Sequence, residues 1–170
     1  MSELRTNRIV PRDGLVSGAS GGIIQVVQNV QGIGQVNSGG GTSEYDIGLN
    51  CTITPQRSDS KILISANWPC IQNGTFTTDF YLNRGTTHIH MTQLYSSTGS
   101  YTVAYPNMMY LDSPSTTSPV TYKISAKATS GNDLRTNYNL TNASSDDSAV
   151  HGDLTGYGSR STMLLMEVSG

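Results

Sequence analysis

Apolar and polar residues alternate along much of this chain with a period of two, which is the spacing of a half-buried β-strand. Between positions 45 and 53 every odd position holds an apolar residue, while the even positions hold Asp, Gly, Asn or Thr. The same alternation returns between positions 120 and 128, where Val, Tyr, Ile and Ala alternate with Thr, Lys and Ser. Each pattern predicts a strand that turns one face toward a core.

Short clusters of turn-forming residues separate these strands. Residues 55–60 read PQRSDS, residues 72–74 read QNG and residues 83–85 read NRG. Such clusters end a strand and reverse the chain. No window shows ten residues with a period of 3.6, so the chain is expected to fold without helices.

Three further segments complete the strand prediction. Residues 62–68 alternate until Pro69 stops the pattern, and residues 87–95 form a strand whose predicted core side is Ile89, Met91 and Tyr95. Near the end, the sequence TMLLMEV at positions 162–168 is almost continuously apolar. A run of this kind predicts a central strand, covered on both faces.

The number and spacing of the strands predict the fold class. About nine or ten strands follow one another at intervals of roughly 8 to 14 residues, as in β-sandwiches and jelly rolls. We therefore predict an all-β, jelly-roll-like β-sandwich over residues 23–170. Because Ile23, Ile24 and the stretch from Met163 to Met166 are apolar on both faces, a partner subunit is expected to cover one sheet, and analogy with short jelly rolls suggests a homotrimer.

The first 22 residues differ from this pattern. They read MSELRTNRIVPRDGLVSGASGG, with few apolar residues among arginines, a proline and a glycine-serine stretch. Such a segment has too little apolar surface to offset the entropy of ordering it. We expect residues 1–22 to be an extended N-terminal arm that becomes ordered on another molecule.

Composition narrows the function classes. Charged residues make up 13% of the chain, the formal net charge is -2, and no basic cluster exists for a phosphate backbone. No segment approaches the twenty apolar residues of a membrane span, and no secretory signal is visible. We therefore expect neither nucleic-acid nor membrane binding, assembly in a cytoplasm, and two free thiols at Cys51 and Cys70.

Several segments resemble one group of known proteins. The opening LRTNRIVPRDGLVSGASGGIIQVVQ is similar to the N-terminal module of small fibre, spike and decoration proteins of tailed bacteriophages, especially marine ones. ITPQRSDSKILI at 53–64, FYLNRGTTHI at 80–89, MMYLDSPSTTSPVTYKI at 108–124 and MLLMEVSG at 163–170 resemble the same group, in the same order.

This resemblance implies a non-enzymatic virion structural protein. The arm would dock on other virion proteins of the tail or capsid, and the sandwich, as a short tail fibre or fibre tip, would be exposed for attachment to a glycan or protein of the host surface. Two alternatives remain: a capsid decoration knob, and a carbohydrate-binding domain. No paired carboxylates or G-x-S-x-G elbow indicate an enzyme, and no motif indicates a cofactor.

Two groups of residues are the candidates for these contacts. Apolar and basic side chains of the arm would bind the particle. Tyrosines near predicted loops would face a receptor or stack on sugars. The alternative is that these tyrosines are ordinary aromatic residues at the edges of the sandwich. The arm residues are Leu4, Arg5, Arg8, Ile9, Val10 and Arg12, and the receptor-facing candidates are Tyr95, Tyr101, Tyr105, Tyr138 and Tyr157.

His88 and His90 form an H-x-H pattern on a predicted strand. The period of two would place both imidazoles on one face, where three copies around a trimer axis would offer six nitrogens to a transition metal. The pair occurs once and no other ligand cluster accompanies it. A solvent-facing or interface pair is therefore the favoured interpretation, and metal binding is the minor alternative.

Overall fold

The computed structural model describes residues 22–31, 36–37, 42–97, 101–129, 133–136 and 160–169, with the backbone alone at Val36, Asn37, Tyr101 and Asp133. These residues form strands, and none of them lies in a helix. The strands are β1 (Ile23–Val30), β2 (Val36–Asn37), β3 (Tyr45–Ile53), β4 (Lys61–Asn67), β5 (Cys70–Asn73), β6 (Phe76–Arg84), β7 (Thr87–Ser96), β8 (Tyr101–Ala104), β9 (Asn107–Asp112), β10 (Val120–Ala128), β11 (Asp133–Thr136) and β12 (Thr162–Val168).

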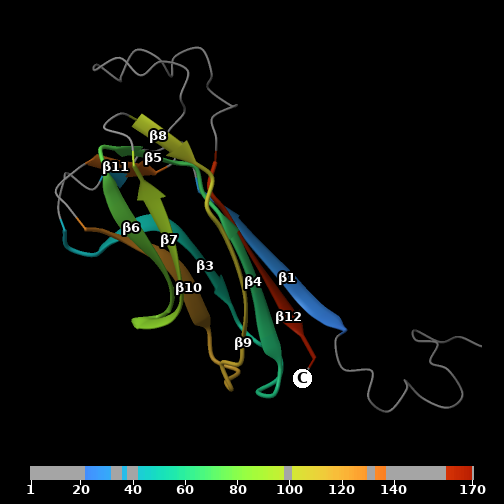
Figure 1. Ribbon diagram of the computed structural model, residues 1–170. Coiled ribbons are helices and arrows are strands. Elements are labelled where there is room, and N and C mark those ends of the chain that lie inside the picture. Colours follow the sequence, from blue (N-terminus) through green and yellow to red (C-terminus); the bar gives the residue numbers. More distant parts are fainter. Residues whose placement is uncertain are drawn as a thin grey trace, which may run out of the picture.

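Two antiparallel sheets pack face to face (Figure 1). One has the strand order β1-β12-β4-β9 and is called the β4 sheet; the other has the order β3-β10-β6-β7 and is called the β10 sheet. The chain crosses repeatedly between them, from β1 to β3, β4 and β6, and from β7 to β9, β10 and β12. This is the strand arrangement of a jelly roll, so the predicted all-β, jelly-roll-like sandwich is confirmed. Within the described residues there is no helix that could cross a membrane.

A third sheet, in the order β2-β11-β5-β8, continues the β4 sheet beyond a bend. Pro69 lies between β4 and β5, and Pro106 lies between β8 and β9. Proline cannot donate to a strand ladder, so both paired strands are interrupted at the same level. The backbone N–H of Trp68 donates to the carbonyl of Pro106 across the bend at 3.1 Å, which holds the two bent strands together.

The period-two pattern agrees with burial in the strands where it was clearest. Along β3, exposed and buried residues alternate from Asp46 to Ile53, and β10 buries every even position. The run at Thr162–Val168 becomes β12, which lies between β1 and β4. Its prediction as a central strand is confirmed.

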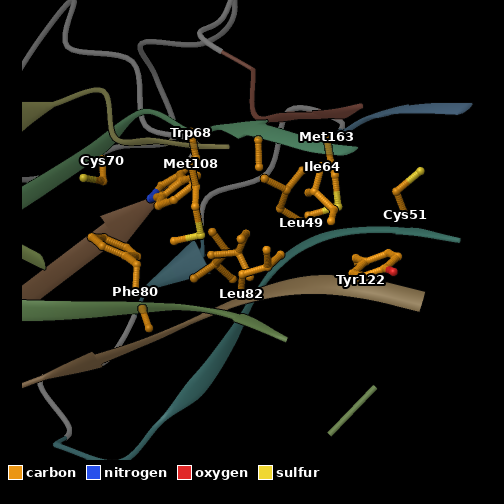
Figure 2. Close-up of a cluster of buried hydrophobic side chains, with 14 of the residues drawn as sticks. Leu49, Cys51, Ile64, Trp68, Cys70, Phe80, Leu82, Met108, Tyr122 and Met163 are labelled. Carbon is orange, nitrogen blue, oxygen red and sulfur yellow. The ribbon is translucent and has the colours of Figure 1, made fainter. Parts of the chain in front are cut away.

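The core lies between the two large sheets, where both contribute large side chains (Figure 2). Trp68 packs against Phe80 with ring centroids 5.1 Å apart and planes tilted by 58°. Both cysteines are buried here with free thiols. The largest fully buried side chains are Trp68, Tyr122, Phe80, Ile47, Leu49, Ile53, Ile62, Ile64, Ile71, Leu82, Ile124 and Leu134.

A charged cluster ties the sheets together at one end. Arg84 of β6 donates from one guanidinium nitrogen to both carboxylate oxygens of Asp112 of β9, each at 3.0 Å. Tyr122 of β10 donates to the same carboxylate at 2.7 Å. Burial first, and then this hydrogen bond, raise the pKa of Tyr122. The carboxylate thus joins both sheets, and leaving it unpaired in the interior would be costly.

A second buried carboxylate anchors the connection between β3 and β4. Glu167 of β12 is fully buried and accepts hydrogen bonds from the side chain of Gln25 and the backbone amides of Gln56 and Arg57. Burial alone would raise the pKa of Glu167, but the hydrogen bonds outweigh it and hold the pKa below its ordinary value. The charged carboxylate therefore stabilises the folded chain.

β7 contains a bulge that the sequence pattern did not predict. Leu82 of β6 lies opposite His90, whereas the next residue, Asn83, lies opposite His88. Ile89 is the extra residue, and an extra residue shifts the alternation of side chains by one position. Even-numbered residues before Ile89 therefore point to the opposite side of β7 from even-numbered residues after it.

The bulge changes which side of β7 faces the core. Met91 and Tyr95 lie on the outer side and are 46% and 63% exposed. Ile89 and Leu94 pack against the core instead. The prediction that Ile89, Met91 and Tyr95 form one core side is wrong for Met91 and Tyr95, because the alternation assumed an unbroken strand.

Candidate functional site

The outer face of the β4 sheet carries an apolar row that crosses all four strands. Met166 of β12 lies opposite Val26 of β1 and Leu63 of β4, and Leu63 lies opposite Leu111 of β9. Directly opposed residues point to the same side of a sheet. The neighbouring Leu165 is fully buried in the core, so this row points outward.

Further apolar residues extend the row along the strands. Ile23, Val26, Met109 and Leu111 are each about half exposed or more, with Met109 at 69%. The one charged side chain among the described paired positions of this surface is Lys61, at its edge. The surface is called here the apolar face, after its apolar members Ile23, Val26, Val30, Leu63, Met109, Leu111, Leu164, Met166 and Val168. The uncharged polar residues Gln28, Ser65, Asn67, Asn107 and Thr162 lie on the same side of the sheet.

The outer face of the β10 sheet is mostly polar, although Met91 and Tyr95 of β7 are exposed on it. Lys123 pairs with Asp46 at 3.4 Å, and the Thr52 and Thr121 hydroxyls are 2.8 Å apart. The imidazole of His88 stacks on the Tyr81 ring with centroids 4.4 Å apart. Polar groups that satisfy one another in this way need no covering partner.

A shallow cleft of about 290 Å³ opens where β7 meets the bend between β8 and β9. β7 is an edge strand of the β10 sheet and β9 is an edge strand of the β4 sheet. Leu94 and Ala104, which pack against the core, form the apolar part of the lining. The lining residues are Thr92, Gln93, Leu94, Ala104, Tyr105, Pro106 and Asn107.

Gln93 lines the cleft from the outer side of β7, where it lies opposite Asp79 of β6. The amide nitrogen of Gln93 donates to Asp79 at 2.8 Å, and Asp79 also accepts from the Tyr81 hydroxyl at 3.2 Å. The amide orientation follows from this bond, because its nitrogen must face the carboxylate. The carbonyl oxygen of Gln93 is consequently left as an acceptor.

Among the predicted contact residues, the structure describes only Tyr95, Tyr101 and Tyr105. Tyr105 lines the cleft and is 67% exposed, and Tyr95 is exposed on the outer side of β7 but does not line the cleft. Only the backbone of Tyr101 is described. The remaining candidates lie outside the described residues: Leu4, Arg5, Arg8, Ile9, Val10, Arg12, Tyr138 and Tyr157.

The two histidines do not share a face. His88 lies on the outer side, where its Nε2 is 3.1 Å from Glu44. His90 points to the opposite side and stacks on Tyr110 of β9 with centroids 5.1 Å apart. The bulge at Ile89 separates them, so the prediction of two imidazoles on one face is wrong. No group of three metal-ligating side chains gathers anywhere in the described part of the chain.

Glu44 and Ser125 join His88 in a cluster that sequence reasoning did not detect. The Ser125 hydroxyl donates to the Glu44 carboxylate oxygen that also faces His88. The Ser125 hydrogen bond is the main cause that lowers the pKa of Glu44. In the serine-histidine-carboxylate triad the imidazole lies between the serine and the carboxylate. Here the carboxylate of Glu44 lies between Ser125 and His88, so the order of the three groups differs from that of the triad.

Comparisons with known proteins identify no family. No family model matches the sequence. No curated protein matches it either. Three solved structures align with this chain at low similarity: dimeric latent PorU from Porphyromonas gingivalis (TM-score 0.41, 7% identity, 89% of this chain and 14% of that chain), the infectious bursal disease virus VP2 subviral particle (0.36, 12%, 86% and 37%) and infectious bursal disease virus Gx strain (0.38, 11%, 98% and 42%).

This chain spans less than half the length of each of these proteins. Two of the three structures come from a virus. Similarity at this level transfers no activity, ligand or assembly to the present protein. Its candidate sites therefore rest on its own residues.

Proposed function

We propose that this protein is a non-enzymatic structural protein of a tailed-phage virion: a short tail fibre or fibre tip. In this proposal residues 1–22 hold it to the particle, and a homotrimer of the sandwich is presented for host attachment. The observation that carries the proposal is the contrast between the apolar face and the polar outer face of the β10 sheet. One surface has the composition of an interface, and the other has the composition of a surface in water.

The apolar face supports self-assembly in particular. A monomer with a contiguous apolar row across four strands would expose a larger apolar patch than isolated surface residues do. Because the face carries almost no charge, equivalent faces of several copies can approach without like-charge repulsion. Three copies packed by their β4 sheets would bury these faces and leave the three β10 sheets outward.

The resemblance to phage fibre, spike and decoration proteins supports the virion role. The segments that carry this resemblance include ITPQRSDSKILI, which contains β4 residues, and MLLMEVSG, which contains most of β12. These two strands form the centre of the β4 sheet. The resembling segments thus include the strands that carry the apolar face.

Two measurements test the proposal. Sedimentation equilibrium of the full chain should give three times the chain mass, and deletion of residues 2–18 should leave that mass ratio unchanged while abolishing binding to phage particles that lack the protein. A monomer at micromolar concentration would refute the assembly. Particle binding that persists after the deletion would refute the anchoring role of the arm.

A further inference from the structure

The cleft beside β7 combines three features in a small volume. Tyr105 presents an exposed aromatic ring, Thr92, Gln93 and Asn107 supply hydroxyl and amide groups, and the inner part is apolar. No lining residue is charged. Small-molecule sites typically have this composition, with a few polar groups around an apolar surface and volumes from about 300 Å³ upward.

We propose that this cleft binds a neutral saccharide, with Tyr105 as the platform on which a sugar ring stacks. A pyranose has an apolar face of C–H groups and a rim of hydroxyls, each of which can donate and accept. The Tyr105 ring suits the apolar face. The Asn107 amide, the Thr92 hydroxyl and the fixed Gln93 carbonyl suit the rim.

The charges around the cleft select against anionic sugars. Asp79 accepts a hydrogen bond from the Gln93 amide at 2.8 Å, so a carboxylate lies next to one of the lining residues. No lysine or arginine lines the cleft to balance a sialic acid, sulfate or phosphate group. An anionic ligand would lose its hydration without gaining a partner.

A peptide is the other ligand to consider, since β7 is an edge strand. A peptide that added to this edge would bind through main-chain hydrogen bonds and would depend little on one tyrosine ring. The aromatic platform and the amide-hydroxyl rim instead favour a sugar. Binding by either ligand would serve host attachment, so the inference rests on the proposed function and names its ligand and site.

The test compares two tyrosines of similar exposure. Tyr105 is 67% exposed in the cleft, and Tyr95 is 63% exposed outside it. Wild type, Tyr105→Ala, Tyr105→Phe and Tyr95→Ala would be applied to an array of neutral oligosaccharides that end in glucose, galactose, mannose or N-acetylglucosamine, beside sialylated and sulfated counterparts. Dissociation constants would be measured for each array ligand that binds, and circular dichroism would confirm that each variant is folded.

The inference expects a neutral ligand whose affinity falls at least about tenfold in Tyr105→Ala, the loss typical of an aromatic hot spot. Tyr105→Phe and Tyr95→Ala should keep wild-type affinity. If Tyr105→Ala failed to fold, Gln93→Ala would replace it, with a loss of several-fold expected. Binding to no array sugar, binding to anionic sugars alone, or binding unchanged by the cleft variants would each overturn the inference.

Failure here would be separate from failure of the proposed function. The array measures ligand binding, whereas the proposed function is tested by oligomer mass and particle binding. A trimer that docks on the particle and ignores every array sugar would overturn the saccharide site alone. A monomer that binds a neutral sugar through Tyr105 would do the reverse.

Discussion

The outer surfaces of the two large sheets differ although the sheets share one core and one topology. On the β4 sheet, Val26, Met166, Leu63 and Leu111 form an apolar row with little charge nearby. On the β10 sheet, charged and hydroxyl side chains pair with one another, as Lys123 does with Asp46. Both sheets contribute buried side chains to the core between them. The difference therefore concerns what each sheet meets outside the chain rather than how the chain folds.

The largest expected effect separates the two sides of β12. Leu165 is fully buried in the core, whereas its neighbour Leu164 belongs to the apolar face. Leu165→Ala should lower the free energy of unfolding by about 3 kcal/mol, because it leaves a cavity. Leu164→Ala should lower it by less than about 1 kcal/mol in the dissociated protein. Urea unfolding, followed by the fluorescence of Trp68, measures both, and equal losses would contradict the assignment of faces.

A charge on each outer face tests whether only one is an interface. Met166→Glu places a carboxylate in the middle of the apolar row and should weaken self-association at least about thirtyfold, equivalent to about 2 kcal/mol. Thr121→Glu adds the same charge to the polar face and should leave association unchanged. Sedimentation velocity across a dilution series gives both constants. If the Thr121 variant dissociated instead, the interface would lie on the β10 sheet.

Acid sensitivity should differ between Glu167 of β12 and Glu44, which lies just before β3. The pKa of Glu167 is lowered in the folded protein, so the folded state binds fewer protons than the unfolded state below neutrality. This contribution is complete above the ordinary carboxyl pKa and is lost as the pH falls through the lowered value. Between about pH 6 and about pH 3 the free energy of unfolding should fall less steeply in Glu167→Gln than in wild type.

Glu44 is the matched control for this measurement. Its pKa is lowered as well, mainly by the Ser125 hydroxyl, but its side chain is 36% exposed. Solvent screens an exposed carboxylate, so Glu44→Gln should flatten the same pH profile less than Glu167→Gln. A larger effect of Glu44→Gln would show that the buried carboxylate is not the main acid-sensitive group.

The smallest expected effect concerns the thiols. Burial raises the pKa of Cys51, and it raises the pKa of Cys70 to about 12. The thiolate is the reactive form, so neither residue should react with a disulfide reagent at about pH 8 until the protein unfolds. Counting released chromophore with and without urea tests this, and rapid labelling of one thiol in the folded protein would contradict the burial of its strand.

Local alternation predicted the strands in which a change of register leaves the faces of the side chains unchanged. Between Lys123 and Ser125 of β10 the partner strand β3 advances by four residues instead of two, and this even offset preserves the alternation. Residues 45–53 and 120–128 alternate in burial as their sequence does, and the apolar run at 162–168 lies at the centre of its sheet. Prediction failed at β7, where Ile89 is an extra residue opposite β6. Neither the core side of β7 nor the faces of His88 and His90 could be deduced, because a bulge depends on the register with another strand.

The candidate surfaces were less predictable than the fold. The sequence showed that Met163–Met166 is apolar on both faces, which correctly indicated apolar residues outside the core. It could not show that Met166 is level with Val26, Leu63 and Leu111. Nor could it show that Gln93 of β7 and Tyr105 line the same cleft. Tyr105 lies at the bend, where Pro69 and Pro106 interrupt two paired strands.

The amino-acid order by itself determined the all-β class, the inward side of the strands without a one-residue bulge, and the excess of apolar residues on β12. It could do so because the alternation of side chains is a local property of extended backbone. Tertiary structure alone decided the apolar row, the cleft and the separation of the two histidines. Each of these depends on which residues of distant strands stand opposite one another, and that register is set by pairing across the whole sandwich.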